Sequence, residues 1–68
     1  MPIRYSSYDL IRIITSDGWY PVGTKGSHHK FKHPHKPGIV VIPHPKASIP
    51  PGTASQILKA SGCEKILH

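Results

Sequence analysis

The first apolar pattern in the chain has the spacing of an amphipathic helix. Four apolar side chains recur at intervals of three and four residues and form one stripe: Leu10, Ile11, Ile13 and Ile14. Ser6 precedes this stripe and Asp9 comes three residues later, an arrangement typical of a capping pair at the start of a helix. Gly18 can adopt the left-handed conformation that ends many helices. We therefore expect a helix over about residues 7–17.

The middle of the chain has the shorter patterns of strands, separated by turn residues. We expect three strands, over about residues 19–24, 27–33 and 39–42. Pro21 makes the first an edge strand, because proline cannot donate a hydrogen bond to a neighbouring strand. Lys25-Gly26 and residues 34–38 are read as turns. The third strand, Ile39-Val40-Val41-Ile42, is continuously apolar and β-branched, which predicts a central strand or one covered on both faces.

A second helix is expected after Pro50-Pro51, because proline is well tolerated in a first helical turn. Its inner stripe and its cap would come from Ala54, Ile57, Leu58, Ser61 and Gly62. The order α-β-β-β-α predicts an α+β fold in which both helices cover one face of a three-stranded antiparallel sheet and leave the other face open. The 68 residues form one domain, with residues 1–5 as an extension and 63–68 as a tail of undetermined structure.

The second strand carries polar chemistry. Alternation along a strand places His28, Lys30 and Lys32 on one face, and His29, Phe31 and His33 on the other. If Phe31 faces the core, the open face carries ammonium groups that attract phosphate and an imidazole that can move a proton near pH 7. This pattern suggests an RNA-cleaving site. The alternative is a basic, solvated strand with Phe31 in the core.

Composition supports an anionic partner. Nine Lys and Arg residues stand against three acidic residues, so that the formal charge is +6 and the pI is near 9.8. A polyanion such as RNA, or an acidic protein, is the expected partner. No apolar run has the length of a membrane span, the N-terminus does not resemble a signal peptide, and Cys63 is alone. We expect a cytoplasmic protein without an internal disulfide and without a membrane partner.

A metal cofactor is not expected. A Mg²⁺ nuclease needs clustered carboxylates, whereas the acidic residues are only Asp9, Asp17 and Glu64. A zinc site could draw on four side chains, but their spacing matches no common ligand pattern: His33, His35, His44 and Cys63.

Four segments in order resemble the HicA toxins of HicA–HicB toxin–antitoxin systems. They are Asp17-Gly18-Trp19-Tyr20, then Lys25-Gly26-Ser27-His28-His29-Lys30-Phe31-Lys32-His33-Pro34, then Val41-Ile42-Pro43-His44-Pro45, and Ile49-Pro50-Pro51-Gly52-Thr53 continuing to Gly62. The resemblance implies a fold similar to a double-stranded-RNA-binding domain and metal-independent endoribonuclease activity on mRNA. It also implies inhibition by an acidic HicB-like antitoxin, and a catalytic role for the histidine of the Gly-Ser-His segment, which here is His28.

In the expected reaction, His28 takes the proton of the RNA 2′-hydroxyl while cationic groups stabilise the phosphorane charge. The phosphate-binding candidates are Lys25, Lys30 and Lys32, together with the backbone amides of Gly26 and Ser27. The general acid is not identified; His44, at a strand end, is a weaker candidate. The alternative function is a non-catalytic RNA-binding module of the same fold, although the second helix offers only Lys59 for such binding.

Overall fold

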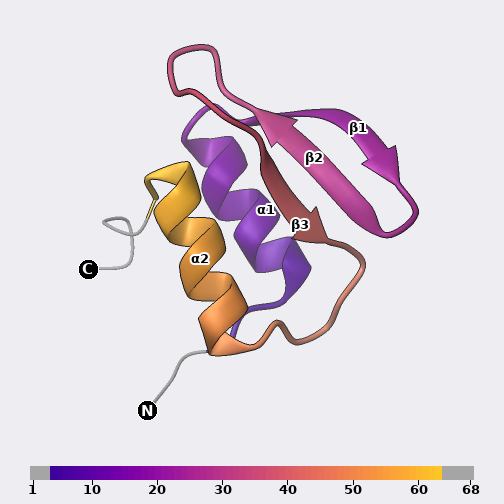
Figure 1. Ribbon diagram of the computed structural model, residues 1–68. Coiled ribbons are helices and arrows are strands. Elements are labelled where there is room, and N and C mark those ends of the chain that lie inside the picture. Colours follow the sequence, from indigo (N-terminus) through magenta and orange to yellow (C-terminus); the bar gives the residue numbers. More distant parts are fainter. Residues whose placement is uncertain (1–3, 64–68) are drawn as a thin grey trace.

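The computed structural model describes residues 4–63 and has the expected element order (Figure 1). Its elements are α1 (Ser7–Ser16), β1 (Tyr20–Lys25), β2 (His28–Lys32), β3 (Val40–Pro43) and α2 (Pro51–Ser61). The strands form one antiparallel sheet, and the two helices lie side by side against the same face of it. The predicted α+β class is therefore confirmed. The expected tail, from residue 64 onward, lies outside the described residues.

The start of α1 is capped as its sequence predicts. The Ser6 hydroxyl accepts a hydrogen bond from the Asp9 amide at 3.1 Å, and the Asp9 carboxylate accepts one from the Ser6 amide at 3.0 Å. The two bonds pair donors that the first helical turn leaves free. They also hold the pKa of the Asp9 carboxyl below its ordinary value, because the backbone and hydroxyl groups of Ser6 stabilise the carboxylate.

The helices and the inner face of the sheet enclose one core. Its buried apolar side chains come from every element except β1, and from the segments between elements: Leu10, Ile14, Trp19, Phe31, Val40, Ile42, Ile49, Ala54, Ile57, Leu58 and Cys63. The inner stripe predicted for α2 is buried, Ser61 included. The chain before α1 is attached to this core, because Tyr5 pairs with Ile49, whose amide donates to the Tyr5 carbonyl at 2.7 Å.

The prediction for the third strand was wrong. The sheet order is β1-β2-β3, so β2 is central and β3 is an edge strand. The helices cover only one face of β3, where Val40 and Ile42 are buried, whereas 41% of Val41 is exposed on the other face. A continuous apolar run was taken to mean burial on both faces, but here it includes an apolar residue on an uncovered face.

The hairpin between β1 and β2 turns one residue later than expected. Lys25 pairs directly with His28, so the two-residue turn is Gly26-Ser27. Gly26 has φ +61° while Ser27 has a negative φ, which is the pattern of a type II′ turn with glycine in its first central position. Farther along, β1 contains a bulge at Val22, where the register with β2 shifts by one residue. As predicted for a strand with Pro21, β1 is an edge.

A polar network joins three parts of the chain at the end of α1. The Lys36 ammonium donates to the Asp17 carboxylate and also, at 3.1 Å, to the Ser61 carbonyl at the end of α2. The Trp19 indole N–H donates to the same Ser61 carbonyl at 3.2 Å. The bond from Lys36 holds the pKa of the Asp17 carboxyl below its ordinary value.

Candidate active site

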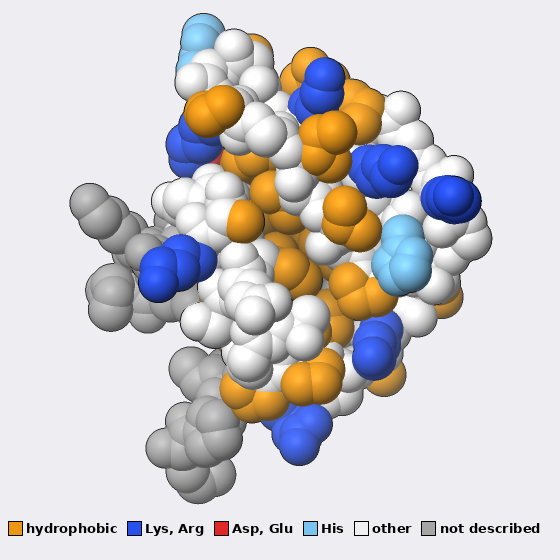
Figure 2. All heavy atoms as spheres, viewed as in Figure 1, with side chains coloured by type: hydrophobic (Ala, Val, Ile, Leu, Met, Phe, Trp, Pro, Cys, Tyr) orange, Lys and Arg blue, Asp and Glu red, His pale blue; other side chains and the backbone are white. Residues whose placement is uncertain are grey.

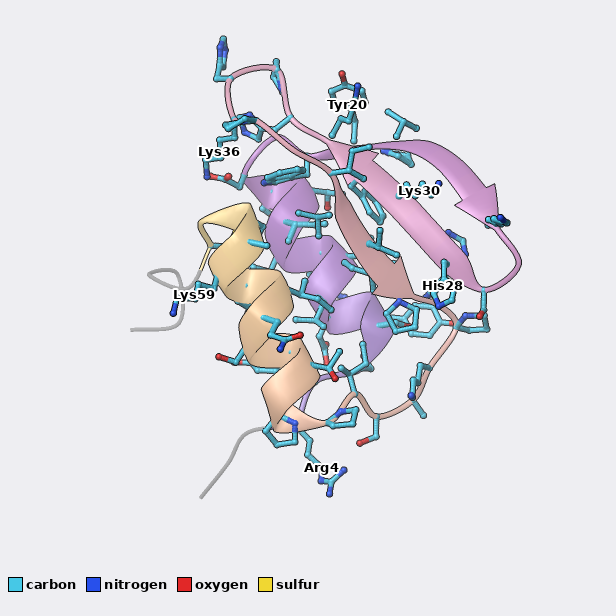
Figure 3. All side chains as sticks on the ribbon, viewed as in Figure 1. Arg4, Tyr20, His28, Lys30, Lys36 and Lys59 are labelled. Carbon is cyan, nitrogen blue, oxygen red and sulfur yellow. The ribbon has the colours of Figure 1, made fainter. Side chains whose placement is uncertain are left out.

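The open face of the sheet carries the predicted cationic row. His28, Lys30 and Lys32 are exposed on β2, while Phe31, which is 3% exposed, points into the core. The three side chains stand on one face in order, roughly 7 Å apart at a strand rise of about 3.3 Å per residue. Figure 3 shows His28 at the end of β2 that adjoins the turn, with Lys30 farther along the strand. This spacing suits the successive phosphates of an extended nucleic-acid strand.

Neighbouring strands extend this row. Lys25 of β1 lies directly opposite His28, and Pro43 of β3 lies opposite it on the other side. Directly opposed side chains in a sheet have Cβ atoms about 4.5–5.5 Å apart, so the Lys25 ammonium and the His28 imidazole can reach one phosphate. At the far end, Tyr20 lies opposite Lys32 and is 46% exposed. Trp19, by contrast, is buried.

The turn beside His28 is held in place by the residue that follows β3. The Ser27 carbonyl accepts a hydrogen bond from the His44 amide at 2.7 Å, while both Gly26 and Ser27 are exposed. A Cβ atom added at Gly26 would meet nothing within 4 Å, so solvent reaches this side of the turn. The predicted phosphate-binding residues Lys25, Gly26 and Ser27 therefore adjoin His28.

His44 does not join this group. It lies on the helix side of the sheet, where its ring packs edge-on against His29 at 4.9 Å and against Tyr8 at 4.6 Å between centroids. The His44 Nδ1 atom is 2.6 Å from the hydroxyl of Ser7, a buried residue that also accepts a hydrogen bond from the Lys46 amide. We call these side chains the His44 cluster: Ser7, Tyr8, His29 and His44.

The Ser7 hydroxyl joins the start of α1 to the segment after β3, because it pairs with the His44 ring and also accepts a hydrogen bond from the Lys46 amide. His29 faces the helices as predicted. Sequence reasoning missed Ser7 because its bond to His44 joins residues 37 positions apart.

His33 is also held in one tautomer. Its Nδ1 atom accepts bonds from the amides of His35 and Lys36 at 2.9 and 3.2 Å, so it carries no proton. Its Nε2 atom donates to the Asp17 carbonyl at 2.8 Å. Both ring nitrogens thus form hydrogen bonds, and these bonds hold the β2–β3 connection against the end of α1. His33 therefore has a structural role.

The metal-ligand candidates are dispersed among the described residues. His33 lies at the C-terminal end of α1, whereas His44 bonds to the first residue of that helix. Within residues 4–63, no three His, Cys, Asp or Glu side chains are arranged to hold a metal ion. Cys63 is buried, and its burial raises the pKa of the thiol, which keeps it protonated.

The fold and this face define a class of protein: a small basic α+β domain with an imidazole among ammonium groups on the uncovered side of a three-stranded sheet. The family model described as the HicA toxin of bacterial toxin–antitoxin systems matches residues 7–63, and the chain belongs to this family. It is therefore the toxin of a toxin–antitoxin pair, with an antitoxin as its partner. No curated protein matches the chain. None of the helices within residues 4–63 is long and apolar enough to cross a membrane.

Proposed function

We propose that this toxin is a metal-independent endoribonuclease that cleaves mRNA in the cytoplasm, with His28 as general base. The observation that carries the proposal is the exposure of an imidazole on a face whose other prominent groups are lysines. His28 makes no side-chain hydrogen bond to any other residue of the described chain, so both ring nitrogens are available to a substrate. Family membership supports the toxin role.

In the proposed reaction RNA supplies its own nucleophile. The neutral imidazole of His28 takes the proton of a 2′-hydroxyl, and the 2′ oxygen attacks the adjacent phosphorus. The bond from phosphorus to the 5′ oxygen breaks, and the leaving oxygen takes a proton from water. The products are a 2′,3′-cyclic phosphate and a 5′-hydroxyl. Lys25, across the hairpin, stabilises the charge of the phosphorane, while Lys30 and Lys32 bind the phosphates that follow.

The partner in this proposal is an acidic HicB-like antitoxin that covers the same face. The chain carries a formal charge of +6, and its lysines on the sheet attract an acidic protein as well as RNA. Because His28 is on the surface, a bound protein silences it by exclusion alone. A conformational change in the toxin is not needed.

The test is the His28→Ala substitution, with His35→Ala as a matched control, because both histidines are exposed. Each variant is induced in bacteria and also purified for RNA cleavage. Removal of a general base should lower the cleavage rate about 10²–10⁴-fold and abolish growth arrest. The free energy of unfolding should change by less than about 0.5 kcal/mol, since His28 contributes no buried contact. His35→Ala should keep full activity.

Three results would contradict the assignment. Equal growth arrest by wild type and His28→Ala would exclude His28 as the base. Loss of RNA affinity and growth arrest together would favour a non-catalytic RNA-binding module. Finally, cleavage products with ordinary 3′-hydroxyl ends would exclude attack by the 2′-hydroxyl, whichever residue is the base.

A further inference from the structure

The outer edge of β3 has unpaired backbone groups. Opposed residues in an antiparallel pair alternate between those that exchange both backbone hydrogen bonds and those that exchange none. The hydrogen bond from the His44 amide to the Ser27 carbonyl shows which pairs are hydrogen-bonded. By this alternation, Val40 and Ile42 each exchange backbone hydrogen bonds with the residue of β2 that lies opposite. Val41 falls between them. Its N–H and C=O therefore point away from β2, beyond the outer edge of the sheet.

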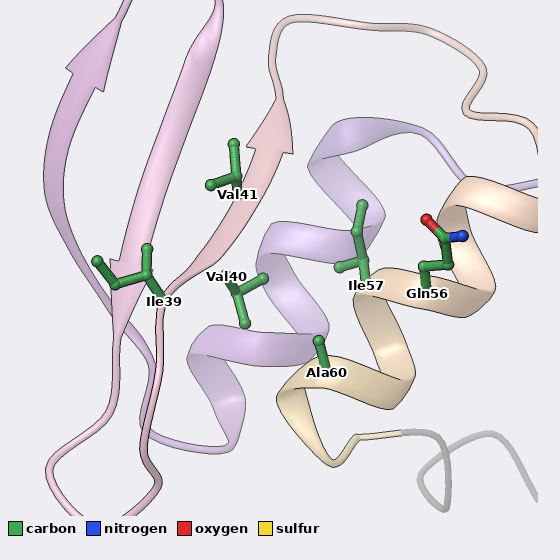
Figure 4. A pocket seen from close by; sticks show the side chains of 6 residues that line it. All are labelled: Ile39, Val40, Val41, Gln56, Ile57 and Ala60. Atoms are coloured by element: carbon green, nitrogen blue, oxygen red, sulfur yellow. The ribbon is translucent and has the colours of Figure 1, made fainter.

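A groove runs beside this edge. Ile39, Val40 and Val41 line one side of it, and α2 supplies the other side with Gln56, Ile57 and Ala60 (Figure 4). Its volume is about 190 Å³. The buried side chains of Val40 and Ile57 form its apolar floor, while Ile39 and Val41 are 52% and 41% exposed at its rim.

The edge lacks the features that usually prevent strands from pairing. Exposed edge strands are commonly protected by a lysine, a proline or a bulge. Ile39-Val40-Val41-Ile42 has none of these, whereas the opposite edge of the sheet, β1, has both Pro21 and a bulge. Only at Pro43 does β3 end in a residue without an N–H. The unprotected stretch is thus short, apolar and flanked by a groove.

Charge identifies the kind of partner. Figure 2 shows an apolar band between the largely uncharged surface of α2 and a column of Lys and His side chains. Lys30 lies directly opposite Val41. A strand added beside β3 would run about 10 Å from β2, and a lysine side chain on β2 and an acidic side chain on the added strand can together span this distance. A second copy of this chain would instead bring one +6 protein against another.

We propose that the antitoxin docks here by strand addition: an extended segment pairs with the backbone of Val41 and adds a fourth strand to the sheet. Alternate residues of the segment are apolar and fill the groove over Val40 and Ile57. The residues between them are acidic and face Lys30. This interface goes beyond the proposed RNA cleavage and does not depend on it. It places the antitoxin next to the cationic row, over which the rest of the partner can extend.

The test uses the cognate antitoxin, purified and titrated into the 68-residue toxin. Val41→Lys introduces the edge protection that β3 lacks, and Ser55→Lys adds the same charge at an exposed position of α2 outside the groove. Val41→Lys should weaken binding at least about tenfold, although its added charge by itself attracts an acidic protein. Ser55→Lys should bind like wild type or slightly better. Thermal unfolding confirms that both variants are folded.

Hydrogen exchange gives an independent readout on the unmodified chain. The Val41 amide faces solvent in the free toxin and should exchange at least about tenfold more slowly in the complex, because it would then donate to the partner's backbone. Unchanged exchange of this amide in the complex, or equal binding by the wild type and Val41→Lys, would overturn the proposal. Self-association of the toxin that Val41→Lys abolishes would assign the edge to a second copy instead and would also overturn it. Because RNA cleavage is not measured, failure here is distinct from failure of the His28 assignment.

Discussion

Asp17 offers the sharpest test of how the fold is held together, because one carboxylate joins the end of α1 to the β2–β3 connection. In the Asp17→Asn variant the side chain keeps its size and loses its charge. The Lys36 ammonium then faces a neutral amide in place of the carboxylate and keeps its bond to the Ser61 carbonyl. The site is partly buried, with 27% of the Asp17 side chain and 35% of the Lys36 side chain exposed.

The expected loss of stability in Asp17→Asn lies between the contributions of two kinds of interaction. Hydrogen bonds to charged groups contribute about 1.5–3 kcal/mol, whereas fully exposed ion pairs contribute about 0.2–1 kcal/mol. With roughly a third of each side chain in water, we expect Asp17→Asn to lower the free energy of unfolding by about 1–2 kcal/mol at pH 7. In a domain of this size each kcal/mol lowers Tm by about 4–8 °C.

The effect should depend on pH with a definite sign. The pKa of Asp17 is lower in the folded protein than in the unfolded chain, so the carboxylate stabilises the fold above the unfolded value of about 3.9. That contribution is lost as the pH falls through the folded pKa. The difference between wild type and Asp17→Asn should therefore be constant near neutrality, begin to shrink below about pH 4, and disappear once the pH lies below the folded pKa.

Urea unfolding followed by tryptophan fluorescence measures both predictions, since Trp19 is the only tryptophan and is buried. Lys36→Gln and the double variant complete a mutant cycle, in which the two single costs should not add. The explanation is refuted if Asp17→Asn costs the same at pH 7 and at pH 2.5, or if the two substitutions are additive.

Two further substitutions test backbone and buried contacts, again by urea unfolding. Gly18→Ala should cost about 2–4 kcal/mol, because its φ of +112° suits glycine and the new Cβ would stand 2.9 Å from His33 Nε2. In the matched Gly52→Ala variant the new Cβ would contact no atom within 4 Å, so the substitution should be neutral or stabilising. Equal losses of stability in the two variants would contradict this account. Ser7→Ala should cost about 1–3 kcal/mol, because it removes a buried hydroxyl and leaves the His44 ring and the Lys46 amide without this partner. Ser55→Ala, at an exposed position, should change stability by less than about 0.5 kcal/mol, and equal effects of the two substitutions would contradict this account.

Local signals in the sequence predicted the parts of the fold that local physics determines. The capping pair of Ser6 and Asp9 and the apolar stripe after it depend on residues within one or two helical turns, and α1 begins where they indicate. The side of the sheet on which His28 lies was predicted from Phe31, because side chains alternate along a strand and one buried residue therefore fixes the faces of its neighbours.

Contacts between distant parts of the chain could not be predicted in this way. The edge position of β3 depends on the order of strands, which the apolar run of Ile39 to Ile42 does not encode. The partners of His44 and of Lys36 lie 37 and 19 positions away, and serine or aspartate at those places has many other uses. Such pairs become visible only when the register and the helix packing are known.

The bulge at Val22 determines which way half of the first strand faces. Tyr20 and Lys25 are an odd number of positions apart, so in a regular strand they would project to opposite sides; the extra residue restores them to the same side. Deleting Val22 would leave the two residues four positions apart, and a regular strand would then keep both on the open face. The bulge therefore accommodates one more residue between Trp19, which packs beneath the helices, and Lys25, at the hairpin, without changing the side on which either projects.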